Sequence, residues 1–345
     1  MKKHILFSLL LISVSVAKAQ DLHFAQSSQT PLFINPGAAG VYDGWERVII
    51  NHRNQWIGAN TQFSTTAIGA DINLWKPQFN DKAHVGLGLL FFNDIGGDSK
   101  FGNQAGSLTL SGILPMGRSG HTLSAGIQGG FGKRKATLTN VSFLSQWDGS
   151  KFDPLIAGET NPLVSFTYMD ASAGIYYVYD GGKNSFQRDS DFKLKIGVAG
   201  FHLNQPELKY TGGSAERLDR KYVGHVSFLK EFSASKYAIE ANGVQFFQGG
   251  HSETILGFML RYRFVNGTKI TGMSQEAFFG LGTYYRHNDA IIPSIMIHWM
   301  GFELGISYDV TISELRKAYG GGSLEFSLSY INLNHSIFKT RKRKY

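Results

Sequence analysis

The sequence contains no cysteine, which excludes disulfide scaffolds, cysteine-ligated zinc or iron–sulfur sites and thiol nucleophiles. Proline is also scarce, with 8 among 345 residues, and charged residues make up only 17%. Soluble domains usually carry about 25% charged residues. Apolar residues reach 42% and aromatic residues 13%, which excludes an intrinsically disordered chain. The composition therefore indicates a folded chain that buries a large surface against itself or against lipid.

Long apolar runs are missing after residue 20, where no stretch approaches the roughly 18 residues of a membrane helix. The apolar run at residues 5–16 follows Lys2 and Lys3 and precedes the small-residue site Ala17-Lys18-Ala19. This order predicts a bacterial secretory signal peptide over residues 1–19, cleaved near Ala19. A retained N-terminal anchor is the alternative. The mature chain is expected to be an exported protein.

The net charge of +8 comes from the two ends of the chain. Three lysines lie in the first twenty residues, and the tail at residues 333–345 carries Lys339, Arg341, Lys342, Arg343 and Lys344. Removing these eight from the 34 basic residues leaves 26, equal to the 26 acidic residues. The body is therefore neutral, and we expect no nucleic-acid partner. The tail is expected in the periplasm, either solvated or in contact with an acidic partner.

Apolar and polar residues alternate along much of the mature chain. Between residues 323 and 330, Leu324, Phe326, Leu328 and Tyr330 alternate with serines and a glutamate. Residues 64–74 and 301–310 show the same period of two. Successive strand side chains point to opposite faces of a sheet, so each segment is a strand with one apolar and one polar face.

About fourteen such strands are predicted. They are expected at residues 45–56, 63–75, 83–94, 102–114, 121–135, 169–179, 192–203, 220–231, 236–247, 252–264, 275–287, 290–299, 301–310 and 322–332. Most have ten to thirteen residues, whereas strands in soluble sheets usually have about 5–6 and a bilayer is crossed by about 9–11. With the export signal, this predicts an all-β fold: a transmembrane antiparallel outer-membrane β-barrel over residues 45–332. A soluble β-sandwich in the periplasm is the alternative.

The loop lengths agree with a barrel. Three long connections, residues 136–168, 204–219 and 311–321, follow strands five, seven and thirteen, so they share one side. Outer-membrane barrels have long loops outside and short turns in the periplasm. With an even strand count both termini are then expected in the periplasm, including an N-terminal segment at residues 20–44.

The polar faces of the strands predict the residues that face the lumen. An arginine facing lipid at mid-depth costs about 2–4 kcal/mol, so arginines on alternating strands are assigned to the inside. The candidate lumen-facing residues are Arg47, Asn51, Arg53, Gln55, Asp71, Arg261, Arg263, Glu303 and Asp309. They either line an open pore or pair across a closed, plugged lumen, and the sequence leaves both possibilities open.

No catalytic or nucleotide-binding motif is present, and we predict no enzyme, metal or cofactor. The pair His225 and Ser227 resembles part of a phospholipase site, but a chance neighbourhood explains it better. Acidic glycine loops at residues 93–98 and 180–191 do not have the spacing of a calcium loop and are interpreted as solvated turns. Gly86, inside a predicted strand, is expected to relieve crowding.

Several motifs resemble one family of outer-membrane proteins. They include Asn35-Pro36-Gly37-Ala38-Ala39-Gly40, Arg53-Asn54-Gln55-Trp56, Phe201-His202-Leu203-Asn204-Gln205-Pro206 and Gly305-Ile306-Ser307-Tyr308-Asp309. Their residues and order resemble the PorP/SprF family across nearly the whole mature chain. Within these motifs, Asn35, Pro36, Trp56, Asn204, Gln205 and Pro206 are candidate contact residues.

The resemblance implies membership of the type IX secretion and gliding apparatus of Bacteroidota, without enzymatic activity. Members similar to SprF are thought to help one large secreted protein, an adhesin, reach the cell surface and stay attached through its C-terminal signal domain. Members similar to PorP associate with periplasmic lipoproteins. We expect the first role. From the residues alone, a passive or substrate-selective, porin-like channel in the lipid of the outer membrane is the alternative.

Overall fold

The computed structural model describes residues 21–55, 63–77, 82–97, 99–117, 120–136, 141–158, 165–184, 192–209, 216–232, 235–265, 277–313 and 322–333. The predicted signal peptide, Trp56 and the basic tail residues Lys339, Arg341, Lys342, Arg343 and Lys344 lie outside these ranges. The strands that build the fold lie within them.

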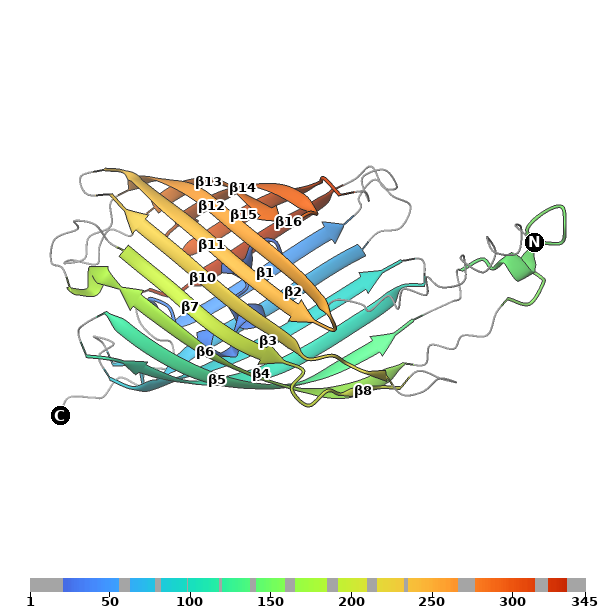
Figure 1. Cartoon of the computed structure of the whole chain (residues 1–345), viewed down its shortest axis with the longest axis horizontal. Coiled ribbons are helices and arrows are strands. Elements are labelled where there is room, and N and C mark those ends of the chain that lie inside the picture. Colours follow the sequence, from blue (N-terminus) through green and yellow to red (C-terminus); the bar gives the residue numbers. More distant parts are fainter. Residues whose placement is uncertain are drawn as a thin grey trace, which may run out of the picture.

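Fourteen antiparallel strands close into a barrel in which β1 pairs with both β2 and β16 (Figure 1). They are β1 (Glu46–Gln55), β2 (Phe63–Leu74), β3 (His84–Gly96), β4 (Phe101–Pro115), β5 (His121–Lys135), β6 (Phe166–Asp180), β7 (Phe192–Phe201), β10 (Lys221–Glu231), β11 (Tyr237–Gln248), β12 (His251–Val265), β13 (Ala277–Arg286), β14 (Ala290–Trp299), β15 (Phe302–Thr311) and β16 (Ser323–Ile331). The predicted fourteen-stranded barrel is confirmed. Because the sheet closes on itself, the two-sheet sandwich was the wrong alternative.

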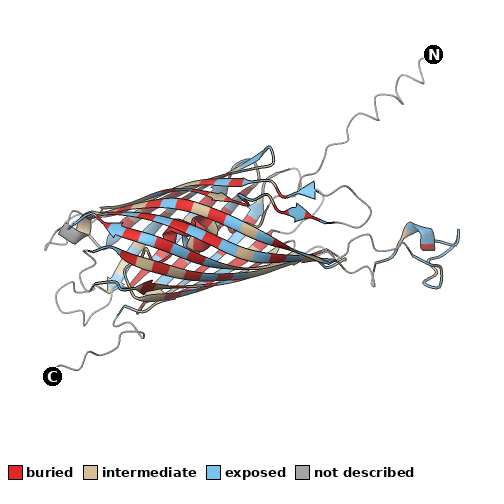
Figure 2. Cartoon of the chain, turned by 90° about the horizontal axis from the view of Figure 1, so that it is seen from below, coloured by how far each residue is buried: buried red, intermediate tan, exposed pale blue. Residues whose placement is uncertain are grey.

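The outer face of the barrel is apolar. Along β12, Leu256 and Phe258 are about half exposed, whereas Ile255 and Met259, which flank them in the strand, are almost fully buried. Figure 2 shows the same alternation of buried and exposed residues along the strands. Strands of 9 to 15 residues are long enough to cross a bilayer. Closure of the sheet pairs the backbone groups that lipid would otherwise leave without partners.

Helical structure is limited to short pieces. The 3₁₀ helix η1 (Ser27–Gln29), the single turn α2 (Pro31–Ile34) and the 3₁₀ helix η2 (Pro36–Ala38) follow one another near the start of the described chain. None of the helices in the described ranges is long and apolar enough to cross a membrane.

The two ends of the barrel differ. We call the end that carries the connections after β5, β7 and β15 the long-loop end, and the opposite end the short-turn end. These three connections share the first end, as their position in the chain predicted, because the strands alternate in direction. Those after β5 and β7 are the longest in the barrel, whereas the connection at residues 312–322 is only as long as those at 181–191 and 266–276 at the short-turn end. At the short-turn end, Met300 and Gly301 alone join β14 to β15.

Residues 21–44 lie inside the barrel, and we call them the plug. At the long-loop end, the backbone N–H of Asp21 donates to Gln248. At the short-turn end, the N–H of Trp45 donates to the carbonyl of Asn332. We expected a periplasmic segment here, with both chain ends on the same side. The structure instead places this segment in the lumen, running from the long-loop end to the short-turn end before β1 begins.

Candidate functional site

Several apolar residues of the plug are almost fully buried in the lumen. Phe24, Ala25, Leu32 and Ala39 are at most 2% exposed. Proline at the first position favours the short helices α2 and η2, because its fixed φ suits a helix start. Between them, Asn35 accepts a hydrogen bond from the backbone N–H of Gly37 at 2.8 Å and so caps η2. The plug is therefore a folded segment with its own local signals.

Glu325, the third residue of β16 counted from the long-loop end, holds the plug through its backbone. This fully buried carboxylate accepts the backbone N–H groups of Ala25 at 2.9 Å and Gln26 at 3.0 Å. The side chain of Gln26 donates to Ser307 at 3.1 Å and accepts from Ser327 at the same distance. A charged acceptor with two backbone donors makes strong hydrogen bonds, so this contact fixes the plug to β15 and β16.

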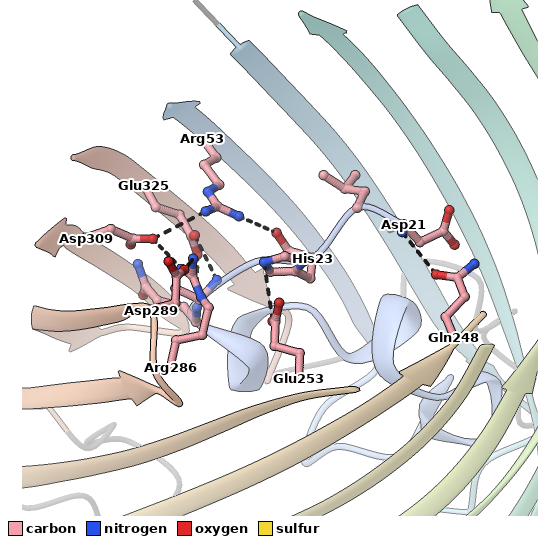
Figure 3. Close-up of polar contacts among 12 residues, drawn as sticks. Asp21, His23, Arg53, Gln248, Glu253, Arg286, Asp289, Asp309 and Glu325 are labelled. Atoms are coloured by element: carbon pink, nitrogen blue, oxygen red, sulfur yellow. Dashed lines mark hydrogen bonds and ion pairs between the residues drawn. The ribbon is translucent and has the colours of Figure 1, made fainter. Parts of the chain in front are cut away.

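A cluster of arginines and carboxylates lies beside this contact (Figure 3). Arg53 on β1 donates to the carbonyl of His23 at 2.8 Å and lies 3.3 Å from Asp309 on β15. Arg286 on β13 pairs with the same Asp309 and, at 2.8 Å, with Asp289. The sequence predicted Arg53 and Asp309 as lumen residues and missed Arg286. Two arginines around one carboxylate connect β1, β13 and β15, and Arg53 also bonds the plug through His23.

Glycines on the inner wall allow the plug backbone to approach closely. A Cβ atom on Gly126 would overlap the carbonyl of Pro36, and one on Gly174 would overlap the side chain of Asn35. The Asn35 amide donates to the carbonyls of Ile175 at 2.8 Å and Val198 at 3.2 Å. These glycines are therefore required by the plug. Gly86 and Gly305 have the same role beside Ala39 and Gln26.

At the long-loop end, the plug is held by His202, which follows β7. His202 contacts Asp21 at 2.5 Å through Nε2 and Asp170 at 2.8 Å through Nδ1, and Lys221 lies 3.9 Å from Asp21. Burial alone lowers the pKa of His202, but the two carboxylates raise it to about 9. Burial alone raises the pKa of Asp21, but His202 and Lys221 hold it well below its usual range. Both groups are therefore charged at neutral pH.

At the short-turn end, the plug is held by Asp71 on β2. Arg47 contacts this carboxylate through Nε at 2.8 Å and Nη2 at 2.7 Å, which is a bidentate pair. Asp71 also accepts the backbone N–H of Gly40 at 2.7 Å. The Tyr42 hydroxyl donates to the Asp71 carbonyl at 2.7 Å. Arg47 and Asp71 were both candidate lumen residues, and the structure brings them together.

The other candidate lumen residues also lie on the inner face. Arg261 pairs with Glu240, and Arg263 pairs with Glu231 at 2.7 Å. Glu303 contacts Gln29 and, at 3.4 Å, His298. Asn51 donates to the Gln29 carbonyl at 3.4 Å, and Gln55 lies beside Arg53. The sequence left open whether these residues line an open pore or pair around a plugged lumen. In the described part of the chain, they pair around the plug.

The family-motif residues fall in two places. Asn35 and Pro36 belong to the plug. Asn204, after β7, bonds the carbonyl of Met169 at 2.8 Å and the N–H of Ala171 at 3.1 Å, which extends the pairing of β6. Beyond it, Gln205 has a positive φ of 45°, and the Pro206 carbonyl accepts the N–H of Leu218 at 2.9 Å. This turn supports the small hairpin of β8 (Glu207–Leu208) and β9 (Glu216–Arg217) at the long-loop end.

No group of three or more metal-ligating side chains occurs in the part of the chain that the structure describes. In the two acidic loops, Asp94 accepts from Thr65 at 2.5 Å and Asp180 pairs with Lys193 at 2.9 Å. Both carboxylates thus already have partners within the protein. The remaining acidic residues of these loops, Asp98, Asp189 and Asp191, lie outside the described ranges.

Comparisons with solved structures found only distant similarities. No curated protein matches the chain. The translocator domain of the autotransporter NalP from Neisseria meningitidis has 11% identity and a TM-score of 0.43, over 89% of this chain and 96% of that one. BamA from Haemophilus ducreyi has 8% identity and a TM-score of 0.43, over 84% and 70%. CdiB from Acinetobacter baumannii has 8% identity and a TM-score of 0.40, over 84% of this chain and only 60% of that one.

The assignment to a family comes from a family model. The model of the type IX secretion system membrane protein PorP/SprF matches residues 16–330, which include the plug and nearly the whole barrel. The earlier resemblance in the motifs is thereby confirmed. Together with the closed barrel, this match indicates a location in the outer membrane. The chain belongs to the PorP/SprF family of type IX secretion system membrane proteins.

Proposed function

We propose that this protein is a non-enzymatic barrel that assists the export of a secreted adhesin and anchors it at the cell surface through the adhesin's C-terminal domain. The observation that carries the proposal is the plugged lumen. The plug is bonded by His202 at the long-loop end, by Glu325 on β16 and by Asp71 at the short-turn end. A barrel filled in this way is suited to holding a partner at its rim.

The long-loop end supplies the contact surface in this proposal, and we place it outside the cell because outer-membrane barrels have their long loops there. Within the connection between β5 and β6, Leu144 and Leu155 are 89% and 92% exposed, and Trp147 is 54% exposed. Gln146 fixes this loop by accepting the N–H of Phe143 and donating to the carbonyl of Ile156, each at 3.0 Å. Ordered apolar side chains on a surface commonly mark a protein interface.

Deletion of the gene tests the export role. We expect one large protein with a type IX C-terminal domain to disappear from the cell surface and to appear in the medium or accumulate inside the cell. Surface proteomics of the deletion strain and the parent measures this. An unchanged surface proteome would contradict the proposal.

A double variant of the loop tests the contact surface. Replacing Trp147 and Leu155 with serine should release the secreted protein while the barrel still reaches the outer membrane in normal amounts. Lys151→Gln, in the same loop, is the matched control and should retain the secreted protein. Equal retention by the double variant would remove this loop from the proposal.

Bilayer recordings separate the proposal from the porin-like alternative. Because the plug fills the lumen, the purified full-length barrel should show no steady conductance in planar bilayers. A stable open channel would favour the alternative.

We further propose cleavage of the signal peptide near Ala19, which N-terminal sequencing of the mature protein checks. Capture of type IX lipoproteins on a tagged barrel would indicate an additional periplasmic role.

A further inference from the structure

A cavity of about 450 Å³ lies between the plug and the inner wall, on the short-turn side of the lumen. Tyr176 on β6, Lys195 on β7 and Ser227 on β10 line its wall. Lys193 and Asp180, which flank the connection between β6 and β7, lie at its short-turn side. The volume is within the range of about 300–1,000 Å³ that small-ligand pockets occupy. It is therefore large enough for a few amino acid residues or a small organic acid.

Most cations in this cavity are already neutralised by carboxylates. Arg47 lies 2.7 Å from Asp71, Lys193 lies 2.9 Å from both Asp43 and Asp180, and Arg261 pairs with Glu240. Lys195 differs from them. Within the described ranges it has neither a carboxylate at ion-pair distance nor a hydrogen-bond partner. A partly buried ammonium group without a counter-ion leaves one positive charge uncompensated.

Two hydroxyl groups that line the same cavity also lack side-chain hydrogen bonds to described residues. Ser227 is the Cα partner of Lys195 across the β7–β10 pair, and side chains in such pairs lie about 5 Å apart at Cβ. Tyr176 is 7% exposed and stacks on His225 with ring centroids 5.2 Å apart. Neither hydroxyl makes a side-chain hydrogen bond to any residue that the structure describes. One cation and two hydroxyl donors thus line the same cavity without an acceptor.

We infer that this cavity binds a carboxylate that enters from the short-turn end, with its charge on Lys195 and hydrogen bonds from Ser227 and Tyr176. A single uncompensated cation balances a single carboxylate. A phosphate, with nearly two negative charges, would exceed the single positive charge that Lys195 offers. The carboxylate belongs either to the C-terminus of a polypeptide or to a small organic acid.

Calorimetric titration of the purified full-length barrel in detergent tests the inference. The probes are acetyl-tetraalanine with a free C-terminal carboxylate, its C-terminal amide, and butyrate. We expect the free-carboxylate peptide to bind and the amide not to bind, because an amide carries no charge for Lys195. Butyrate that binds as tightly as the peptide would indicate a small acid as the source. Weaker binding of butyrate would indicate a polypeptide C-terminus.

Variants of the cavity give the matched comparison. Lys195→Gln should weaken binding of the peptide by about tenfold or more, as expected for loss of a charge-assisted hydrogen bond. Lys195→Arg should retain binding, and Ser227→Ala should weaken it less. Lys230→Gln is the control, because Lys230 follows the cavity-lining Leu229 on β10 and so points to the opposite face.

The inference is overturned if neither carboxylate probe binds, if the amide binds equally well, or if Lys195→Gln leaves the affinity unchanged. Should Lys195→Gln fail to fold, judged by its migration with and without heating, Ser227→Ala and Lys195→Arg provide the comparison. These measurements use purified protein. They are therefore independent of the proposed anchoring function, which surface proteomics tests separately.

Discussion

At the scale of single residues, glycine decides where the plug can contact the wall. Gly126 and Gly129 lie on the same strand, β5, but face opposite sides. A Cβ on Gly126 would overlap the carbonyl of Pro36, whereas a Cβ on Gly129 would meet no atom within 4 Å. Three residues apart along a strand, the same amino acid thus has a packing role on the inner face and none on the outer face.

Gly126→Ala should therefore destabilise the protein, and Gly129→Ala should not. The new methyl group must push Pro36 away from the wall, and overpacking of this kind typically costs about 1–3 kcal/mol. Exposed substitutions usually stay within about 0.5 kcal/mol. Urea unfolding of both variants in detergent measures the difference. Equal stabilities would mean that the plug does not lie against β5 at this point.

The His202 contact predicts a pH dependence. Its pKa of about 9 in the folded protein lies above the ordinary value of 6.5, so its stabilising contribution is complete below pH 6.5 and is lost as the pH rises through 9. The free energy of unfolding should fall over this window, and His202→Gln should flatten the profile. His287→Gln, at an exposed position, is the control and should leave the profile unchanged. A flat profile in the parent protein would contradict the contact.

The sequence predicted lumen residues only where strand alternation places them. Arg53 and Asp309 were found because an inward arginine and an inward acid fit the period of two. Glu325 has the same alternation, but its partners Ala25 and Gln26 lie about 300 positions away in the chain and bond through their backbone. Backbone donors leave no trace in the residue pattern. This is why the wall could be predicted from the sequence and its contacts with the plug could not.

At the scale of elements, the strands were predictable and the plug was not. Each strand has one face toward lipid and one toward the lumen. All fourteen strands therefore show the same alternation of apolar and polar residues. The plug lies within the barrel wall and has no face toward lipid, and its helices have only three or four residues. Such short pieces show no period. The signals that remain are prolines at helix starts and the unusually small residues on the facing wall.

Removal of the plug should convert the barrel into an open channel. The strands pair with one another independently of the plug, and the polar inner wall would then face water, as in porins. A variant lacking residues 22–41 should show steady conductance in planar bilayers, against none for the full-length protein. Gly129→Ala, with an intact plug, should stay silent. A deletion variant that reaches the outer membrane and remains silent would show that another segment closes the lumen.

At the scale of the whole molecule, the plug determines at which end of the barrel the described chain begins. An even number of strands alone would put both ends of the barrel domain on one side. Asp21, however, is bonded beside Gln248 and His202 at the long-loop end, whereas Asn332 after the last strand lies at the short-turn end. The segment of residues 21–44 therefore crosses the lumen once more than the strand count implies. Because of this extra crossing, the described chain begins at the end of the barrel opposite to Asn332.

The two ends of the mature chain should consequently be exposed on opposite sides of the outer membrane. An epitope inserted directly before Asp21 should be labelled by antibody on intact cells, because the first described residue lies at the end with the long loops. The same epitope placed at the C-terminus should be labelled only after the outer membrane is permeabilised, and it serves as the matched control. If the N-terminal epitope also required permeabilisation, the plug would have to enter from the periplasm, and the contact between Asp21 and His202 could not form in the cell.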